Sequence, residues 1–260
     1  MDRKLYIFDL DGTIYRGDQA LPGAAETVAK LRAQGHAIRF LTNNSSITRA
    51  GIASKLNQLG VATEEGECYG TAPAAAEYLV KQGWLTAFVV GQPTLAQELT
   101  NSRIQVWNFD GERFRPGATG NPDVVLVGIC LGYTYEWMSE ALQCLMQGSA
   151  FVATNRDATY PLGEGRIVPG AGAIVASLVA CSGREPTVIG KPEPAMIQHL
   201  IAESGFEPSQ VVVVGDRMDT EIEAGKRAGC RTWLVLTGVT HELPPAQVGG
   251  STLVDLLSFD

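Results

Sequence analysis

Cysteine is scarce in this sequence, and no two cysteines are spaced for a common task. The five cysteines are odd in number and include no CxxC pair, so the sequence predicts neither a disulfide framework nor a zinc cluster. Scattered thiols of this kind are typical of a reducing compartment. Their positions are Cys68, Cys130, Cys144, Cys181 and Cys230.

Long hydrophobic runs and an excess of basic charge are absent as well. The first apolar stretch, Leu5–Leu10, is too short for the hydrophobic region of a secretory signal or for a membrane span, so we expect a cytoplasmic protein. The formal net charge of -8 disfavours nucleic acid and anionic membranes as partners. An anionic substrate would therefore have to be held by local donors and a metal ion.

Short apolar runs alternate with helical patterns along the chain, which has 260 residues, 45% of them hydrophobic. This alternation predicts an α/β fold with parallel strands joined by helical crossovers. Helices are expected at Ala24–Gln34, Pro194–Ser204 and Thr220–Ala228. Strands are expected at Leu5–Phe8, Ala37–Leu41, Thr86–Val90, Val124–Val127, Phe151–Ala153, Thr187–Ile189, Val211–Val214 and Thr232–Leu236.

The middle of the chain differs in composition from its two ends. Residues 101–123 are rich in Asn, Gly, Arg and Pro, which indicates loops and short strands. The outer thirds instead repeat the strand and helix pattern of one sheet. We therefore predict a core domain made of residues 1–79 and 181–260, with a second domain inserted at 80–180.

Two aspartates follow the first predicted strand, in the segment Phe8-Asp9-Leu10-Asp11-Gly12-Thr13. Ligands of open α/β sheets bind beyond the carboxyl ends of the strands, so Asp9 and Asp11 lie where a site would form. Two like charges this close require a cation or a shared proton, and Mg2+ prefers such oxygen ligands. The alternative, that both aspartates only cap the next element, is disfavoured because Asp9 directly follows a buried strand.

Three further polar segments follow predicted strands: Thr42-Asn43-Asn44, Lys191 and Gly215-Asp216. Taken singly, each has a common structural explanation as a helix cap, a surface charge or a turn. Taken together, they would bring a hydroxyl, amide donors, a cation and a third acid to one edge of one sheet. Chance convergence of this kind is improbable, so the pattern predicts a functional site at this edge.

The order DLDGT, LTNNS, GKP and GDRMDTE resembles the haloacid dehalogenase-like phosphatases over nearly the whole chain. The inserted segment is similar to their type C2 cap, and the overall pattern is similar to the NagD-like branch with its p-nitrophenyl phosphatase relatives. The resemblance implies a Rossmann-like parallel-sheet core, a cap that determines substrate specificity, and Mg2+-dependent hydrolysis of a small phosphate monoester such as a nucleotide or sugar phosphate.

The resemblance also implies roles for the residues of the four segments. Asp9 would be the nucleophile that forms an aspartyl-phosphate, and Asp11 the general acid and base. Asp9, the backbone carbonyl of Asp11, and Asp216 would hold Mg2+. The phosphate oxygens would be bound by Thr42, the Asn43 amide and Lys191, while Thr13 would orient the first loop.

Two places in the sequence depart from the family pattern. Relatives usually have an aspartate where this chain has Glu221, so we expect Glu221 to act through metal-bound water, with Asp219 as a possible substitute. The predicted substrate loop of the cap, Asn155-Arg156-Asp157, has an arginine where many relatives have proline. Arg156 would either clamp a second anionic group of the substrate or be an exposed surface charge.

Other functions fit the sequence less well. A Walker-type nucleoside triphosphatase and a dinucleotide-binding domain are disfavoured because neither glycine pattern is present. A phosphotransferase on the same scaffold stays open, as does a non-catalytic metabolite-binding protein, because fold alone does not imply turnover. A homodimer is also open, and Trp107, Tyr135 and Trp137 on the cap could contribute to its interface.

Overall fold

The computed structural model describes residues 3–115, 117, 120–161 and 167–259. The chain forms two compact units. The core unit comprises Met1–Thr42, Arg49–Tyr69 and Lys191–Asp260, and the inserted unit comprises Asn43–Thr48 and Gly70–Gly190.

The inserted unit is longer than the predicted segment 80–180. The predicted boundaries fall inside two helices, α3 (Thr71–Lys81) and α6 (Ala171–Ser182), which lie wholly in the inserted unit. Both helices are rich in alanine and other small apolar residues, so no change in composition marks the point where one unit gives way to the other. The boundaries therefore shift outward by several residues at both ends.

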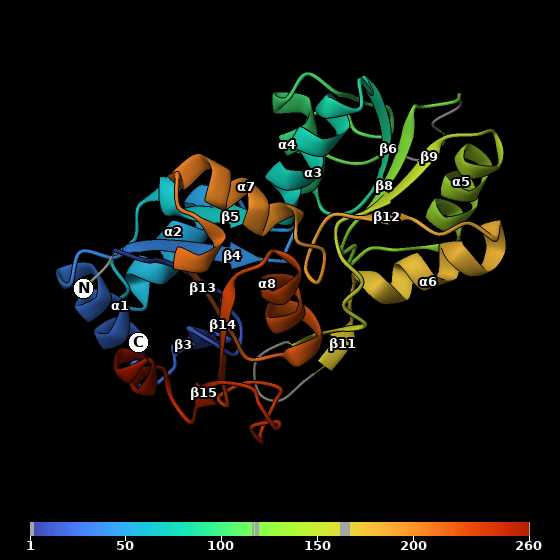
Figure 1. The fold of residues 1–260 in the computed structure, drawn as a ribbon. Helices are drawn as coiled ribbons and strands as arrows, with labels where there is room; N and C mark the ends of the chain where they lie inside the picture. Colours follow the sequence, from blue (N-terminus) through green and yellow to red (C-terminus); the bar gives the residue numbers. More distant parts are fainter. Residues whose placement is uncertain (1–2, 116, 118–119, 162–166, 260) are drawn as a thin grey trace. The chain divides into compact units, whose positions relative to one another are not determined.

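The core unit is built on a six-stranded sheet with β1 near its centre (Figure 1). β1 and β13 run parallel with Leu5 opposite Val211 and Phe8 opposite Val214, and every residue in both strands is buried. Such uninterrupted apolar strands require cover on both faces of the sheet. In spatial order the strands are β15 (Gly249–Gly250), β14 (Arg231–Val235), β13 (Val211–Gly215), β1 (Leu5–Phe8), β4 (Ala37–Thr42) and β5 (Cys68–Gly70).

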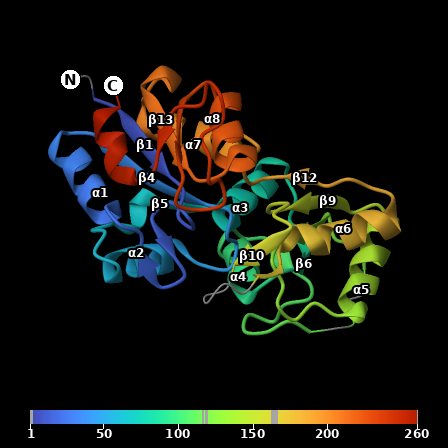
Figure 2. The ribbon, with the colours of Figure 1, turned by 90° about the horizontal axis from the view of Figure 1, so that it is seen from below.

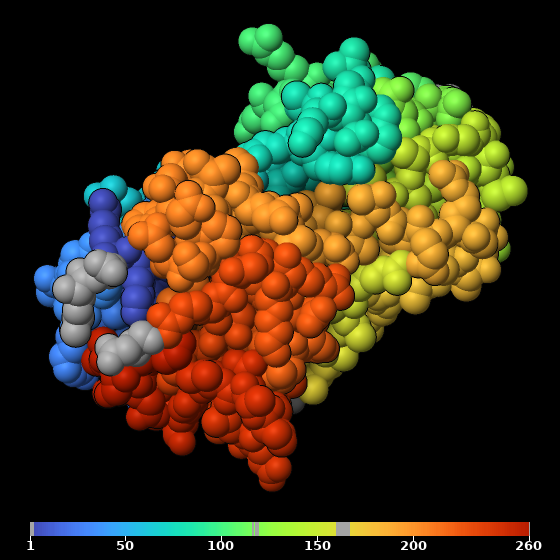
Figure 3. Space-filling model, in the orientation of Figure 1, coloured from blue at the N-terminus to red at the C-terminus, as the bar shows by residue number. Residues whose placement is uncertain are grey.

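Helices cover both faces of the core sheet. The chain moves from β1 towards β5 in its first part and from β13 towards β15 in its last, and right-handed crossovers in opposite directions place their helices on opposite faces. Figure 2 shows α1 on one side of the sheet and α7 and α8 on the other. In Figure 3 the part of the core unit that follows Lys191, coloured orange to red, covers much of that unit's visible face. The helices are α1 (Ala24–Ala33), α2 (Arg49–Gln58), α7 (Ala195–Ser204) and α8 (Glu223–Arg227), with the short helical turns η1 (Glu65–Glu67), η2 (Pro208–Gln210), η3 (Met218–Ile222) and η4 (Leu253–Ser258) and a hairpin of β2 (Tyr15–Arg16) and β3 (Gln19–Ala20).

The inserted unit has its own five-stranded parallel sheet, in the order β12-β9-β8-β6-β7. The helices α3 and α4 cover one face and α5 and α6 the other (Figure 1). The apolar side chains of α5 and α6 pack with those of β6, β8 and β9 into one core. The remaining elements are β6 (Thr86–Val90), α4 (Pro93–Asn101), β7 (Gln105–Val106), β8 (Val124–Val127), α5 (Tyr135–Met146), β9 (Ala150–Ala153), the hairpin of β10 (Thr159–Pro161) and β11 (Ile167–Pro169), and β12 (Thr187–Val188).

One predicted strand belongs to a different sheet from the one expected. Thr187–Val188 was placed in the core domain by the sequence, but β12 pairs with β9 in the sheet of the inserted unit. This strand has only two residues and pairs on one side, so its own sequence does not specify a partner. The expectation that Lys191 follows a strand of the core sheet is therefore wrong, although Lys191 itself belongs to the core unit.

All five cysteines are unpaired. Within the described part of the chain, every helix is too short or too polar to cross a lipid bilayer.

Candidate active site

Asp9 and Asp216 lie side by side at the carboxyl edge of the core sheet. Each follows a central strand, and the Asp9 amide donates a hydrogen bond to the Val214 carbonyl at 2.9 Å, which extends the pairing of β1 and β13 by one residue. Both aspartates are buried, with 8% and 2% of their surface exposed. The register of two apolar strands thus fixes the positions of two carboxylates.

Lys191 supplies the positive charge of this edge. Its ammonium group lies 2.5 Å from Asp9 Oδ1 and 2.8 Å from Glu221 Oε1, and it donates a longer hydrogen bond of 3.4 Å to the Leu41 carbonyl. Only 2% of the Lys191 side chain is exposed. Burial opposes the charged form, but the carboxylates of Asp9 and Glu221 outweigh it and raise the pKa of Lys191, so this cation is held within the site.

Glu221 is the third carboxylate of the site, and a π turn positions it. In η3 the wider helical turn buries Thr220, Glu221 and Ile222, while Asp219 points outward with 72% of its side chain exposed. The stem of Glu221 occupies the space above Gly215, where an added Cβ would lie 2.2 Å from Glu221 Cγ. The absence of a side chain at residue 215 therefore makes room for a glutamate.

Burial and mutual repulsion raise the pKa values of the two central aspartates. Burial raises the pKa of Asp9 well above its usual range, Lys191 opposes this rise, and the charges of Glu221 and Asp216 add to it. Burial and the charge of Glu221 raise the pKa of Asp216 to about 6, although the Val239 amide donates a hydrogen bond of 2.7 Å to its Oδ2 atom. The site therefore holds more negative charge than Lys191 alone offsets.

The residues of this site fit a divalent cation. Carboxylate oxygens from Asp9, Asp216 and Glu221 all lie within 4.8 Å of one another. Three buried oxygen donors around one ammonium group form a hard, anionic ligand set of the kind that Mg2+ prefers. A cation bound there would also remove the repulsion that raises the pKa values of both aspartates.

Two family models match the chain, one towards each end of the sequence. Residues 6–105 match the haloacid dehalogenase-like hydrolase model, and residues 188–254 match a second HAD-hydrolase-like model. The chain belongs to the haloacid dehalogenase-like hydrolases.

The curated relatives of this hydrolase include several phosphatases. It is 36% identical to phosphoglycolate phosphatase 1A, chloroplastic, of Arabidopsis thaliana over 90% of this chain and 69% of the relative. It is 37% identical to glycerol-3-phosphate phosphatase of Homo sapiens over 90% of this chain and 79% of the relative. A 5'-nucleotidase of Bacillus subtilis is 34% identical over 91% of this chain and 88% of the relative.

Solved structures give the same result. The p-nitrophenyl phosphatase from Archaeoglobus fulgidus superposes with a TM-score of 0.86 at 30% identity over 99% of both chains. NagD from E. coli gives a TM-score of 0.83 at 30% identity over 98% of both chains. A glycerol phosphate phosphatase from Mycobacterium tuberculosis, in complex with magnesium, gives 0.85 at 30% identity over 98% of this chain and 76% of the other. The hydrolase is thus a phosphatase of the NagD-like branch, a family whose members generally depend on Mg2+.

Asp11 and Thr13 of the phosphatase lie in the loop that follows β1. Asp11 is partly buried, and burial raises its pKa, while the Lys55 charge, a hydrogen bond from the Tyr15 hydroxyl and the Lys191 charge oppose the rise. Thr13 is fully buried, and its hydroxyl oxygen has no hydrogen-bond partner among the residues that the structure describes. Thr42 lies at the end of β4 and is 5% exposed.

Asp219 is not brought into the site of the phosphatase. Its carboxylate pairs with Arg217 at 3.1 Å on the surface, and the hydrogen bonds from Arg217 lower its pKa. The suggestion that Asp219 substitutes for the usual family aspartate is therefore not supported by its position. Glu221 lies where its carboxylate joins Asp9 and Asp216 directly.

The loop that follows β14 also belongs to the site, although it was not predicted from the sequence. There, Gly238 packs against the Asp216 carboxylate so closely that an added Cβ would lie 1.8 Å from Oδ2, and Val239 donates its amide to the same oxygen. The hydroxyl of Thr237 donates to the Gly12 carbonyl at 2.7 Å, which ties this loop to the first one. The sequence did contain one indication of this loop. It follows the predicted strand Thr232–Leu236, whose carboxyl end lies at the same edge of the core sheet as Asp9 and Asp216.

The predicted cap loop forms a hydrogen-bond network within the inserted unit. The side-chain amides of Asn155 and Asn43 both donate to Asp157 Oδ2, at 2.6 and 3.1 Å. Thr154 donates to the Asn155 side chain at 2.9 Å, and Thr71 donates to the Asn43 carbonyl at 2.9 Å. Asp157 thus joins the segment after β4 to the segment after β9.

Arg156 points to a different partner. Its guanidinium group pairs with Glu185, and 46% and 66% of the two side chains are exposed. Of its two interpretations, this position favours the exposed surface charge.

The inserted unit also has a pocket of about 330 Å³ at the carboxyl end of its sheet. The chain leaves β6 for β7 on one side and returns to β8 on the other, so the order of the strands reverses between β6 and β8. Ligands of open parallel sheets bind at such reversals. The pocket is lined by Ser46, Gln92, Pro93, Thr94, Ile129 and Leu131.

Proposed function

We propose that this phosphatase uses Mg2+ and a covalent phosphoryl group on Asp9 to hydrolyse small phosphorylated metabolites. The observation that carries the proposal is the cluster of three buried carboxylates around the Lys191 ammonium group at the edge of the core sheet. A protein that only bound metabolites would have no use for an uncompensated anionic cluster next to a buried lysine.

In the proposed reaction an Asp9 carboxylate oxygen attacks phosphorus and displaces the ester oxygen, which takes a proton from Asp11. Water then attacks phosphorus, gives its proton to Asp11 and releases inorganic phosphate from Asp9. Bound Mg2+ would be held by Asp9, Asp216 and the Asp11 backbone carbonyl, with Glu221 beside them, and would neutralise the charge of the phosphate group. Lys191, Thr42 and the Asn43 amide would bind the phosphate oxygens.

The relatives suggest the size of the substrate. The named relatives act on phosphoglycolate, glycerol phosphate and 5'-nucleotides, all small esters. We assign recognition of the organic part of the substrate to the inserted unit, whose pocket combines apolar side chains with a few polar ones. Replacing Ile129 with alanine should change the order of preference within a panel of such esters, and an unchanged order would contradict this assignment.

Phosphate release tests the reaction. The wild-type protein should release phosphate from p-nitrophenyl phosphate with Mg2+ and not with EDTA, without any added acceptor other than water. Asp9→Asn should lower turnover by roughly 10⁴-fold without loss of thermal stability, because the change is nearly isosteric and removes one charge from an anionic cluster. The matched control is Asp219→Asn, which alters an exposed carboxylate and should retain activity within about twofold.

Two outcomes would contradict the proposal. Phosphate release that needs an alcohol acceptor would indicate a phosphotransferase. Metal-dependent release no greater than that of Asp9→Asn would indicate a binding protein. In rapid-quench experiments, radiolabelled phosphate should be found on Asp9 in the wild type.

The cellular setting of the enzyme stays a proposal. The five unpaired cysteines favour a reducing compartment such as the cytoplasm. A homodimer through the cap also stays a prediction. Of the three aromatic residues suggested for its interface, Tyr135 is exposed, Trp137 packs against Phe114 at 4.8 Å between ring centroids, and Trp107 packs close to Gly120.

A further inference from the structure

Tyr15 lies against the loop that carries Asp11. The Gly12 amide donates a hydrogen bond of 2.8 Å to the Tyr15 carbonyl, and Asp11 and Tyr15 form an isolated bridge between the ends of the loop. The Tyr15 side chain is 5% exposed, and its hydroxyl hydrogen-bonds to the Asp11 carboxyl group. The backbone of the loop and this hydroxyl thus constrain Asp11 at two points.

Lys55 comes from a distant part of the chain and contacts the same tyrosine. It lies in α2, and its ammonium nitrogen is 3.8 Å from the centroid of the Tyr15 ring. An ammonium group over an aromatic face is attracted by the ring quadrupole. The side chain of Lys55 is only partly exposed, so it can hold the ring in place.

We infer that Tyr15 and Lys55 are positioning residues for Asp11, with Lys55 fixing the Tyr15 ring and the Tyr15 hydroxyl fixing the Asp11 carboxyl group. The inference rests on the proposed function, in which Asp11 transfers a proton in both steps. Neither residue contacts phosphorus or the departing oxygen in this scheme, and both act through the position of Asp11.

The position of the Asp11 carboxyl group affects the rate most when the leaving group needs a proton. When the bond between phosphorus and the ester oxygen breaks, an alkoxide must receive the Asp11 proton, whereas p-nitrophenolate is stable without it. General acid catalysis requires the acid to lie within hydrogen-bond reach of that oxygen. A loosened Asp11 carboxyl group should therefore slow the hydrolysis of alkyl phosphates more than that of aryl phosphates.

The first test is Tyr15→Phe, which removes the hydroxyl and keeps the ring under Lys55. The kcat for glycerol phosphate should fall about tenfold and that for p-nitrophenyl phosphate at most about threefold, with KM little changed. Asp11→Asn serves as the reference for complete loss of the acid. An equal fall for both esters, or no fall, would overturn the inference.

The second test is Lys55→Met, alone and combined with Tyr15→Phe. If Lys55 acts through the tyrosine hydroxyl, Lys55→Met should lower the same ratio of alkyl to aryl activity by about threefold and add nothing in the double variant. Lys55→Arg, which keeps a cation over the ring, should restore the ratio. An additive loss in the double variant would refute the proposed order of action.

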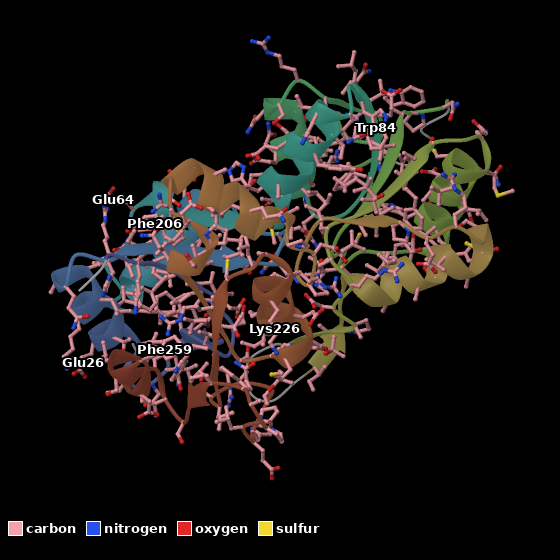
Figure 4. The ribbon with its side chains drawn as sticks, viewed as in Figure 1. Glu26, Glu64, Trp84, Phe206, Lys226 and Phe259 are labelled. Atoms are coloured by element: carbon pink, nitrogen blue, oxygen red, sulfur yellow. The ribbon has the colours of Figure 1, made fainter. Side chains whose placement is uncertain are left out.

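Controls separate positioning from general damage and from failure of the proposed function. Arg231 also lies over an aromatic ring, that of Phe259, at 4.3 Å from the ring centroid (Figure 4). This pair lies at the opposite edge of the core sheet, where β14 begins. Arg231→Met should therefore leave the ratio of alkyl to aryl activity unchanged. If Tyr15→Phe lowers the melting temperature, the Lys55 variants test the inference instead, because they change a side chain that is partly exposed. If the wild type hydrolyses neither ester, the proposed function fails, whereas an active wild type with an unchanged ratio in Tyr15→Phe refutes only this inference.

Discussion

The two parallel sheets of the phosphatase have the same kind of architecture, but the polar groups at their carboxyl edges differ in charge balance. At the edge of the core sheet, three buried carboxylates share one ammonium group. In the inserted unit the segment after β9 has one carboxylate, Asp157, which accepts hydrogen bonds from two side-chain amides. The core edge requires a further cation to reach neutrality, while the inserted edge is satisfied by its own donors.

In the proposed function, this difference separates reaction at the core edge from substrate recognition at the inserted edge. An edge with excess negative charge attracts a metal ion and raises the pKa values of its acids, and the metal ion would in turn hold the phosphate anion. An edge of amides, hydroxyls and apolar side chains instead discriminates among shapes. Two parallel sheets of the same architecture thus differ in function through a few side chains at their carboxyl edges.

The largest effect should come from removing Lys191, the cation that contacts both Asp9 and Glu221 at the core edge. Lys191→Met leaves the Asp9, Asp216 and Glu221 carboxylates buried without a positive partner, so the free energy of unfolding should fall by about 3–5 kcal/mol. Urea denaturation without metal measures this loss. Because Mg2+ replaces the missing charge, added Mg2+ should raise the melting temperature of the variant more than that of the wild type.

An equal gain from Mg2+ in both proteins would argue that the cation binds elsewhere. The matched control is Lys30→Met, which removes a lysine from an exposed ion pair, that with Glu26 on α1, instead of from a buried one. It should change stability by less than about 1 kcal/mol.

Several strands of the two sheets could be predicted from the sequence because their residues strongly favour buried strands. The runs Leu5–Phe8, Thr86–Val90 and Val124–Val127 were predicted with the bounds that β1, β6 and β8 have, since continuous apolar, mostly branched residues favour buried strands. β5, the three residues Cys68–Gly70, has no such pattern and was not predicted. Short edge strands depend on tertiary pairing, which the local sequence does not encode.

The site was predictable only in part, for a related reason. Asp9 and Asp216 follow buried strands, so their meeting follows from topology. Lys191 does reach Asp9, but the strand before it belongs to the other sheet, and the prediction that it shares the core edge through that strand was wrong. Val239 contributes a backbone amide to the Asp216 carboxylate, and a contact made by the backbone cannot be predicted from a pattern of side chains.

The next largest effect concerns pH and the charge of Asp216. Its pKa is raised to about 6 in the folded protein, above its ordinary value of 3.8, so between about pH 4 and 6 only the folded state holds the proton. The folded state then binds more protons than the unfolded state, and stability falls as pH rises through this window. The loss contributed by this group should be roughly 3 kcal/mol in metal-free protein.

A difference measurement isolates this contribution from that of other acids. The free energy of unfolding should be measured from pH 4 to 7 for the wild type and for Asp216→Asn, which has no charge to gain. The gap between the two should widen as pH rises, in favour of the variant. With saturating Mg2+ the wild type should lose this slope, and a slope that persists would mean that Asp216 does not bind the ion.

A smaller effect should follow from filling the space beside Asp216. Gly238→Ala places a methyl group where the Asp216 carboxylate lies, so the carboxylate must move. Misplacing a group that orients a metal ligand typically costs tenfold or more in affinity, and we expect Mg2+ binding measured by calorimetry to weaken by about tenfold. Gly66→Ala, with nothing within 4 Å of the new methyl group, is the matched control and should bind Mg2+ as the wild type does.

The smallest effects should distinguish two neighbouring residues of the inserted unit. Asp157→Ala removes the acceptor of two amide hydrogen bonds and should lower stability by about 1–3 kcal/mol, with faster hydrogen exchange in the segments after β4 and β9.

Arg156→Ala breaks an exposed ion pair with Glu185 and should cost less than about 1 kcal/mol. If Arg156 instead clamps the substrate, its loss should raise KM at least tenfold for phosphoglycolate, which has a second anionic group, and leave KM for p-nitrophenyl phosphate unchanged. We expect KM to change by less than about twofold for both esters, because the guanidinium group already has a partner on the surface.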